Sequence, residues 1–234
     1  MRFRGILIAS FVTATLLMSC AAYALTENFE SYSTGLIPPH WSVYQGSWEI
    51  LEDFEGNRAL YYNDATLWGA IRYDLGNGWN DYPVEVKSNL EYALSGNYFG
   101  IGGRVNAAGA GYWLRRSLGS GGIVDLWRGT SYNASFVNWL GSASLPADGK
   151  SHTIALDFEG CVIRVYVDGV KKIQKTDTAY AGGSIAFKSG TGCFTWFDNV
   201  QAGPAPVPEP SSLIALGSGL LGLVGALRRK IVKG

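Results

Sequence analysis

Histidine and cysteine are scarce in this 234-residue chain, which contains two of the former and three of the latter. Zinc sites are built largely from these residue types, so their scarcity argues against a zinc centre. A Ser-His-Asp arrangement would have to use His40 or His152. The first follows two prolines and the second begins a predicted strand, so we assign structural roles to both.

Charge is also scarce. Charged residues make up 16% of the sequence, with 19 basic against 19 acidic, and several of the basic ones lie in the terminal segments. The region between those segments is therefore mildly acidic, which argues against nucleic acid and against an anionic membrane surface as partners. No phosphate-cradling loop or basic patch is present in the sequence.

Residues 211–227 form an uncharged, apolar run. As a helix, at about 1.5 Å per residue, the run would span roughly 25 Å, near the lower limit for a bilayer core. Arg228, Arg229 and Lys230 follow it directly. The positive-inside rule then predicts a transmembrane helix at 211–227, a cytoplasmic tail at 228–234 and an N-terminus outside.

A proline-rich linker, residues 203–210, precedes this run and ends in Pro208, Glu209 and Pro210. A Pro-Glu-Pro motif, a short span and a basic cluster, in that order, resemble the PEP-CTERM sorting signal of exported Gram-negative proteins. The resemblance implies recognition by an exosortase, processing near the motif, and transfer to the cell surface or extracellular matrix. The alternative is an ordinary single-pass tail anchor, which also places the domain outside the cytoplasm.

Residues 1–24 have the three parts of a secretory signal peptide. Arg2 and Arg4 form a positive region, residues 5–18 an apolar region, and Ala22-Tyr23-Ala24 a small-x-small site. This pattern predicts cleavage by signal peptidase after Ala24. A lipoprotein signal with a lipidated Cys20 is the alternative, although Met18 fits that pattern poorly.

Removal of the signal peptide leaves Cys161 and Cys193 as the two cysteines of the mature chain. An even pair in an oxidising compartment predicts a disulfide. Two unpaired thiols are the alternative. A bridge requires Cα atoms about 4.4 to 6.8 Å apart, and the sequence alone does not give that distance.

Residues 25–202 are predicted to be all-β. Runs rich in β-branched and aromatic residues recur about every eight to twelve residues, separated by Gly, Asn, Asp or Ser, as in sandwiches and barrels. Asp168-Gly169 predicts a two-residue type I′ hairpin, and alternation places Ile163, Val165 and Val167 on one face. The candidate strands are 48–53, 59–63, 67–75, 83–94, 98–105, 112–117, 123–128, 136–140, 151–159, 162–168, 170–176, 183–188 and 194–201.

The order of several short motifs resembles concanavalin A-like lectin/glucanase domains, the laminin-G-like jelly rolls. The motifs are Glu27-Asn28-Phe29-Glu30, Pro38-Pro39-His40-Trp41, Gly46-Ser47-Trp48, Tyr166-Val167-Asp168-Gly169, Gly183-Ser184-Ile185-Ala186-Phe187 and Trp196-Phe197-Asp198-Asn199-Val200. The resemblance implies a two-sheet antiparallel jelly-roll sandwich over residues 25–202, with the first and last strands paired. Another β-sandwich carbohydrate module with the same two-sheet architecture is the alternative.

Glycoside hydrolysis requires two carboxylates about 5 to 9.5 Å apart. Laminarinase-type enzymes of the resembled fold carry Glu-x-Asp-x-x-Glu on one strand. The nearest match, which consists of Glu49, Glu52, Asp53 and Glu55, has the wrong spacing and leads into a turn, so no catalytic residue is assigned. The resemblance extends to keto-disaccharide hydrolase-like proteins, so a glycoside hydrolase acting on envelope glycans is an alternative function.

Glu27, Glu30, Asp198 and Asn199 are expected to meet where the first and last strands pair. Carboxylate and amide oxygens are the ligands that calcium prefers, so they predict a structural calcium ion; no other cofactor is predicted. A β-bulge at Asp198 and Asn199 is a competing and compatible interpretation, because the apolar residues around them cannot all face inward on strict alternation.

Aromatic residues are abundant, with 8 Trp, 13 Tyr and 10 Phe. Sugar rings stack on exposed aromatic planes, and their hydroxyls bind Asn, Asp and Arg. Alternation in strands 112–117 and 123–128 places Trp113, Arg115, Asp125 and Trp127 on one face, which we predict to bind a ligand. The alternative is that both tryptophans lie in the core between the sheets.

These features predict an exported bacterial surface or matrix protein that binds polysaccharide without catalysis. Its predicted partners are signal peptidase, an exosortase and a polysaccharide. Anchoring in the inner membrane is expected before processing, and nucleic acid is not expected to bind. The alternatives are a glycoside hydrolase and a purely structural envelope protein that neither binds nor cleaves glycans.

Overall fold

The computed structural model describes residues 25–53, 56–64, 66–93, 98–117, 122–133, 137–145 and 150–204. All regular structure in these ranges is β. The strands are β1 (Leu25–Glu27), β2 (Trp41–Gln45), β3 (Trp48–Glu52), β4 (Arg58–Tyr62), β5 (Gly69–Tyr73), β6 (Pro83–Ala93), β7 (Tyr98–Val105), β8 (Gly111–Ser117), β9 (Ile123–Gly129), β10 (Asn138–Ser144), β11 (His152–Glu159), β12 (Val162–Val167), β13 (Val170–Thr176), β14 (Ser184–Ser189) and β15 (Cys193–Ala202).

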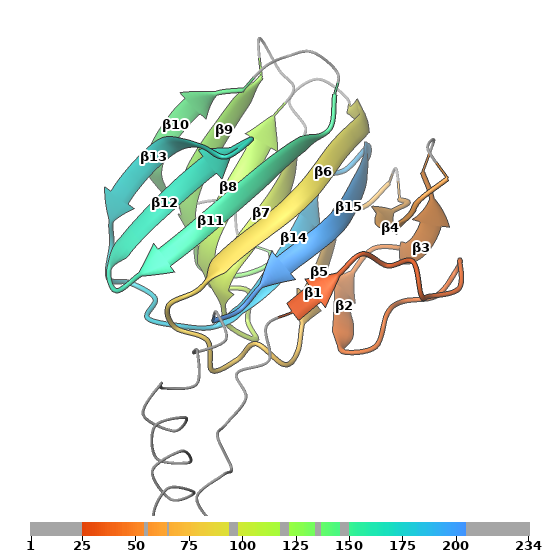
Figure 1. Ribbon diagram of the computed structural model, residues 1–234, viewed down its shortest axis with the longest axis horizontal. Helices are drawn as coiled ribbons and strands as arrows, with labels where there is room; N and C mark the ends of the chain where they lie inside the picture. Colours follow the sequence, from red (N-terminus) through yellow and green to blue (C-terminus); the bar gives the residue numbers. More distant parts are fainter. Residues whose placement is uncertain are drawn as a thin grey trace, which may run out of the picture. The chain divides into compact units, whose positions relative to one another are not determined.

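The strands form two antiparallel sheets packed face to face, as Figure 1 shows. Sheet A has the order β13-β12-β11-β6-β15-β4-β3, with β1 added beside β15. Sheet B has the order β10-β9-β8-β7-β14-β5-β2. The predicted all-β, two-sheet antiparallel sandwich is therefore confirmed.

Apolar residues of both sheets meet in one core within the unit Ala24–Pro204. At its centre the ring of Phe187 on β14 stacks on that of Phe197 on β15, with centroids 4.3 Å apart and planes 10° apart. Because this unit contains the whole described core and every described strand, we expect it to fold as an independent domain.

The β11–β12–β13 meander follows the alternation expected from its sequence. Ile163, Val165 and Val167 are buried, as predicted for the inward face of β12. Asp168 and Gly169 both have positive φ angles, 49° and 74°, which is the geometry of the predicted type I′ hairpin. In sheet A, β13 is the edge strand, and its lysines are exposed at positions 171, 172 and 175. It also contacts β10, the edge strand of sheet B.

The first and last strands are paired, as the fold resemblance implied. In the β1–β15 register, Leu25 lies opposite Ala202 and Glu27 opposite Val200. The ladder between β15 and β6 shifts register between Asp198 and Gln201, and Asn199 has a φ of 50°. The predicted bulge is therefore present.

Two strands were absent from the candidate strand ranges. Each candidate range corresponds to one of β3 to β15, whereas β1 was expected only from the fold resemblance and β2 was missed. The three residues of β1 are too few for an alternation pattern. The β2 segment follows two prolines and His40, which itself has a φ of 66°, so the region has the sequence features of a loop.

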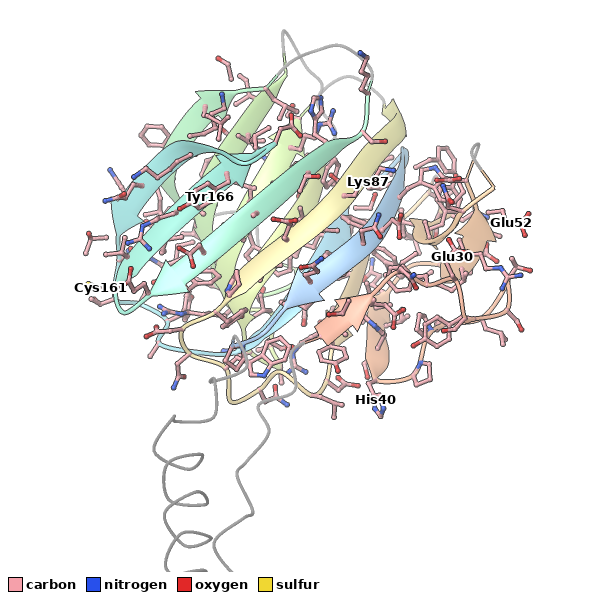
Figure 2. The ribbon with its side chains drawn as sticks, viewed as in Figure 1. Glu30, His40, Glu52, Lys87, Cys161 and Tyr166 are labelled. Carbon is pink, nitrogen blue, oxygen red and sulfur yellow. The ribbon has the colours of Figure 1, made fainter. Side chains whose placement is uncertain are left out.

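The predicted disulfide is not formed, since Cys161 and Cys193 are both free thiols. Cys193 begins β15 opposite Ala93, at one end of β6. Cys161 lies in the β11–β12 turn (Figure 2), beyond the register pair Asp157 and Pro83 at the other end of β6. At about 3.3 Å per residue, the length of β6 separates the two cysteines by roughly 30 Å.

The predicted signal peptide, transmembrane helix and Pro-Glu-Pro motif lie outside the described residues. Within the described ranges, no helix has the length and apolarity needed to cross a bilayer.

Candidate functional site

The outer face of sheet B carries the four residues predicted to bind a ligand. Along β8 and β9 the alternate residues Tyr112, Leu114, Val124 and Leu126 enter the main core, so the residues between them face away from it. Trp113 lies opposite Trp127 and Arg115 opposite Asp125 in the strand register. The structure therefore brings Trp113, Arg115, Asp125 and Trp127 together on one face.

A hydrogen-bonded chain crosses β8, β9 and β10 on this face. Arg115 Nη2 donates to Asp125 Oδ2 at 2.6 Å, and the Ser142 hydroxyl donates to the other carboxylate oxygen of Asp125. Trp139 Nε1 then donates to Ser142 Oγ at 2.8 Å. Because each group fixes the next, the polar atoms have defined positions next to Trp139, which is 58% exposed.

Aromatic rings flank this polar chain. The Arg115 guanidinium lies 5.1 Å from the centroid of the Trp127 ring and 5.5 Å from that of Tyr98. Trp127 and Tyr98 are partly exposed. We call Trp139, Trp127, Tyr98, Arg115 and Asp125 the aromatic–polar platform. It combines apolar planes with fixed donors and acceptors, the combination that sugar rings require.

Trp113 has a different role from the other three predicted residues. It is fully buried, yet it belongs to a second small cluster, outside the main core, with Ala70, Val105, Tyr132 and Ala186. Its indole lies over Gly102, where a Cβ would come within 2.8 Å of the ring. Trp113 therefore supports the face from beneath. It is neither exposed on the face nor buried between the two sheets, which were the two predicted placements.

A second aromatic group lies across the same sheet face, near β2 and β5. Tyr44 is 50% exposed. It stacks on Trp68 with centroids 6.1 Å apart and packs against the tilted ring of Tyr132 at 4.6 Å. Asn133 Nδ2 donates to Tyr44 Oη at 3.2 Å. Sequence reasoning missed this group because β2 was not recognised and because Tyr132 belongs to a loop.

Lys188 on β14 anchors that loop. Its side chain is buried, its ammonium lies 4.3 Å from the centroid of the Trp113 ring, and Nζ donates to the Ser131 carbonyl at 3.2 Å. Burial lowers the pKa of the ammonium from 10.5 to about 8. A cation held over an aromatic ring and bonded to a loop carbonyl fixes the loop against the sheet.

This lowered pKa predicts a pH-dependent stability difference between the wild type and Lys188→Met. Between about pH 8 and 10.5 the folded state has lost the Lys188 proton that the unfolded state keeps, so this residue's contribution to the unfolding free energy rises with pH. The gain is at most about 3.5 kcal/mol over the window, at about 1.4 kcal/mol per pKa unit. Denaturant titrations of both proteins across this range measure it, and a constant difference would contradict it.

The predicted calcium ligands do not form a shared site. Glu27 accepts hydrogen bonds from Phe29 N at 2.9 Å and from Tyr32 Oη at 2.7 Å. Glu30 accepts one from Arg58 N, and Asp198 accepts from Asn199. Among the residues that the structure describes, no group of three or more His, Cys, Asp and Glu side chains could hold a metal. These carboxylates cap turns and a bulge within the fold.

Acidic residues are few on sheet B. Its seven strands contain one carboxylate, Asp125, which Arg115 and Ser142 bind. Glu49 lies in sheet A, where it accepts a hydrogen bond from Asn63 Nδ2 at 3.1 Å. Asp53 caps the turn after β3 through Asn57 N, and Glu55 falls outside the described residues.

Of the two histidines predicted to be structural, His152 is buried, and its Nδ1 lies 2.8 Å from Asp168 Oδ2.

An open depression of about 360 Å³ lies at another part of the domain, lined by residues that include Asp81, Cys161, Asp177 and Tyr180. Arg104 forms part of its wall and is 1% exposed. Its guanidinium donates to the carbonyls of Asn80, Gly160 and Tyr180 and to Asp81 Oδ1. The arginine thereby ties three loops together, and its donors are used within the fold.

Comparison with known proteins identifies the C-terminal segment. Residues 206–230 match the family model of the PEP-CTERM protein-sorting motif. The chain carries a PEP-CTERM sorting signal. That finding confirms the predicted motif, whose Pro-Glu-Pro and basic cluster both lie in the matched range. No curated protein matches the sequence.

Solved structures with the same fold include several whose names refer to carbohydrates. The carbohydrate-binding module CBM66 from Bacillus subtilis has 16% identity and a TM-score of 0.56, covering 70% of this chain and 96% of its own. The VIP36 exoplasmic/lumenal domain in its Ca²⁺/Man₂-bound form has 14% identity, a TM-score of 0.58 and coverages of 81% and 90%. The apo Crh5 transglycosylase has 13% identity and a TM-score of 0.58, and the match covers 80% of this chain and 86% of its own. At these identities the likeness concerns the fold alone, and it agrees with the resemblance to concanavalin A-like domains.

Proposed function

We propose that the domain binds polysaccharide through the outer face of sheet B without cleaving it. The observation that carries this proposal is the aromatic–polar platform, in which exposed Trp139 and partly exposed Trp127 flank the Arg115–Asp125–Ser142 chain. Stacking on indole rings binds the apolar faces of sugar rings, and the fixed donors and acceptors bind their hydroxyls.

We propose binding without catalysis because the strands of this face supply too few carboxylates for a glycosidase. A glycosidase holds two acids on either side of the scissile bond, whereas the strands of sheet B supply Asp125 alone. Asp125 is also bound by Arg115 and Ser142, so both of its oxygens already accept hydrogen bonds. A bound chain on this face would therefore be retained without cleavage.

The proposed place of action follows from the sorting signal. We propose that signal peptidase removes residues 1–24 and that residues 211–227 hold the precursor in the inner membrane. An exosortase then processes the Pro208-Glu209-Pro210 region and releases the domain to the cell surface or matrix. The motif match at residues 206–230 supports this route.

A binding assay on the domain, residues 25–204, tests the function. We expect the domain to co-sediment with at least one insoluble or gel-forming polysaccharide and to release no soluble sugar from it over a day of incubation. Release of reducing sugar would favour the glycoside hydrolase alternative. If the domain neither binds nor cleaves any glycan of a broad panel, the purely structural alternative is favoured.

A further inference from the structure

Arg72 is a buried cation with two unused hydrogen-bond donors. It extends from β5 on the outer face of sheet B and is 8% exposed. Its Nη1 lies 3.4 Å from Asp74 Oδ1, a long contact. Its Nε and Nη2 atoms are buried and have no hydrogen-bond partner among the described residues. Those two atoms form one edge of the guanidinium, whose paired N–H groups match the two oxygens of a carboxylate.

A second unused polar group lies close by. The side chain of Tyr132 is 4% exposed, and its hydroxyl also lacks a partner within the part of the chain that the structure describes. Burial raises the pKa of Tyr132, while the charge of Arg72 lowers it and that of Asp74 raises it. Tyr132 packs in one cluster with Ala70 and Ala186, and Ala186 lies opposite Arg72 in the β14–β5 register, so the two side chains are neighbours on this face.

Unused buried donors at one place indicate a partner from outside the fold. Leaving a charged donor buried and unpaired destabilises a protein, so native structures do so rarely. Here the guanidinium edge and the phenol gather on a single face, next to the stacked rings of Tyr44 and Trp68. The missing partner must be an acceptor, and beside a cation an anionic one is favoured.

We propose that Arg72 and Tyr132 bind the carboxylate of a uronic acid residue whose sugar ring stacks on Tyr44, so that the domain selects acidic polysaccharides. This inference rests on the proposed polysaccharide-binding function and names the class of ligand. The carboxylate accepts two N–H groups from the edge of Arg72 and the hydroxyl of Tyr132.

Asp74 does not prevent this binding. Its second carboxylate oxygen accepts the Ser42 hydroxyl at 2.5 Å, which draws the acid toward β2. The carboxylate side chain is also 39% exposed, so water screens its charge. The 3.4 Å contact uses one nitrogen of Arg72, on the other side of the guanidinium from the free edge.

The test compares a polyuronate with the same polymer after chemical reduction of its carboxyl groups to neutral alcohols. We expect affinity electrophoresis or calorimetry of residues 25–204 to give at least tenfold tighter binding to the polyuronate. Arg72→Gln should bring the affinity for the polyuronate close to that for the reduced polymer. Arg164→Gln, at a solvent-facing arginine of sheet A that is bound by Asp157 and Glu159, is the matched control and should retain wild-type affinity.

Tyr132→Phe provides a second arm that does not depend on the folding of the arginine variant. Removing a hydroxyl that has no partner should leave the melting temperature unchanged or raised, yet the affinity for the polyuronate should fall several-fold. An unchanged affinity in this variant would overturn the inference.

Three other outcomes would also overturn it. Equal binding of the polyuronate and its reduced form would reject the carboxylate site and leave the proposed function intact. Equally tight binding of a sulfated glucan, which has sulfate groups and no carboxylates, would show that the face recognises anions in general. Failure to bind any polysaccharide would reject the proposed function together with this inference.

Discussion

Arg104→Met is expected to lower the free energy of unfolding by about 3–5 kcal/mol, the range for removing one partner from a buried, hydrogen-bonded charged network. Methionine keeps the aliphatic volume beside Phe158, whose ring centroid lies 4.9 Å from the guanidinium. It supplies none of the donors, so the carbonyls of Asn80, Gly160 and Tyr180 each lose a hydrogen bond. Chemical denaturation followed by tryptophan fluorescence measures the loss.

Arg164→Met is the control for this prediction. Arg164 also forms two ion pairs, with Asp157 at 2.9 Å and Glu159 at 2.7 Å, but it lies at the solvent-facing surface of sheet A. Exposed ion pairs contribute little to stability, so this variant should unfold at nearly the wild-type denaturant concentration. Similar losses in both variants would show that the buried network of Arg104 has no special importance.

Trp139→Ala is expected to weaken polysaccharide binding by about thirtyfold, or about 2 kcal/mol, the value typical of a tryptophan that contributes strongly to a binding surface. The side chain is 58% exposed on the edge strand β10, so the unfolding free energy should change by less than about 0.5 kcal/mol. Trp127→Ala should also weaken binding, because it removes the ring beneath Arg115. Affinity electrophoresis in gels with and without polysaccharide measures both effects.

Trp196→Ala is the matched control for the platform. Trp196 is a partly exposed tryptophan on the opposite side of the domain, on sheet A, where it packs against Tyr61 with ring centroids 4.2 Å apart. Its loss should leave the affinity unchanged. If Trp196→Ala weakened binding as much as Trp139→Ala did, the proposed location of the site on sheet B would be wrong.

Local patterns predicted the architecture well because alternation and turn chemistry act over a few residues. The Asp168-Gly169 hairpin needs only two residues that tolerate positive φ, and both have it. The pairing of β1 with β15 joins the ends of the domain, so no local pattern contains it. It was predicted from the fold resemblance.

The candidate site was predicted in part for the same reason. Strand alternation placed Arg115 beside Asp125 and Trp113 beside Trp127, and the register agrees. Alternation could not show that Trp113 is buried beneath Tyr132 and Lys188, because that cover comes from a loop and from another strand. Arg72 and Tyr132 were missed since unused donors are a property of packing and leave no sequence pattern.

The disulfide prediction failed on a different point. The even number of cysteines and the oxidising compartment of an exported chain both favour a disulfide. Neither fact contains information on the distance between the two cysteines. The turn that carries Cys161 and the start of β15 lie at opposite ends of β6. Only the assembled sheet reveals that separation.

The exposed lysines of β13 affect how copies of this protein interact when they lie close together. A protein delivered to a surface meets many copies of itself at close range, and an open sandwich margin can recruit a neighbouring chain into its ladder. Three ammonium groups on that margin repel an identical margin and stay hydrated. We therefore expect the β13 edge to resist strand pairing between neighbouring copies of the domain.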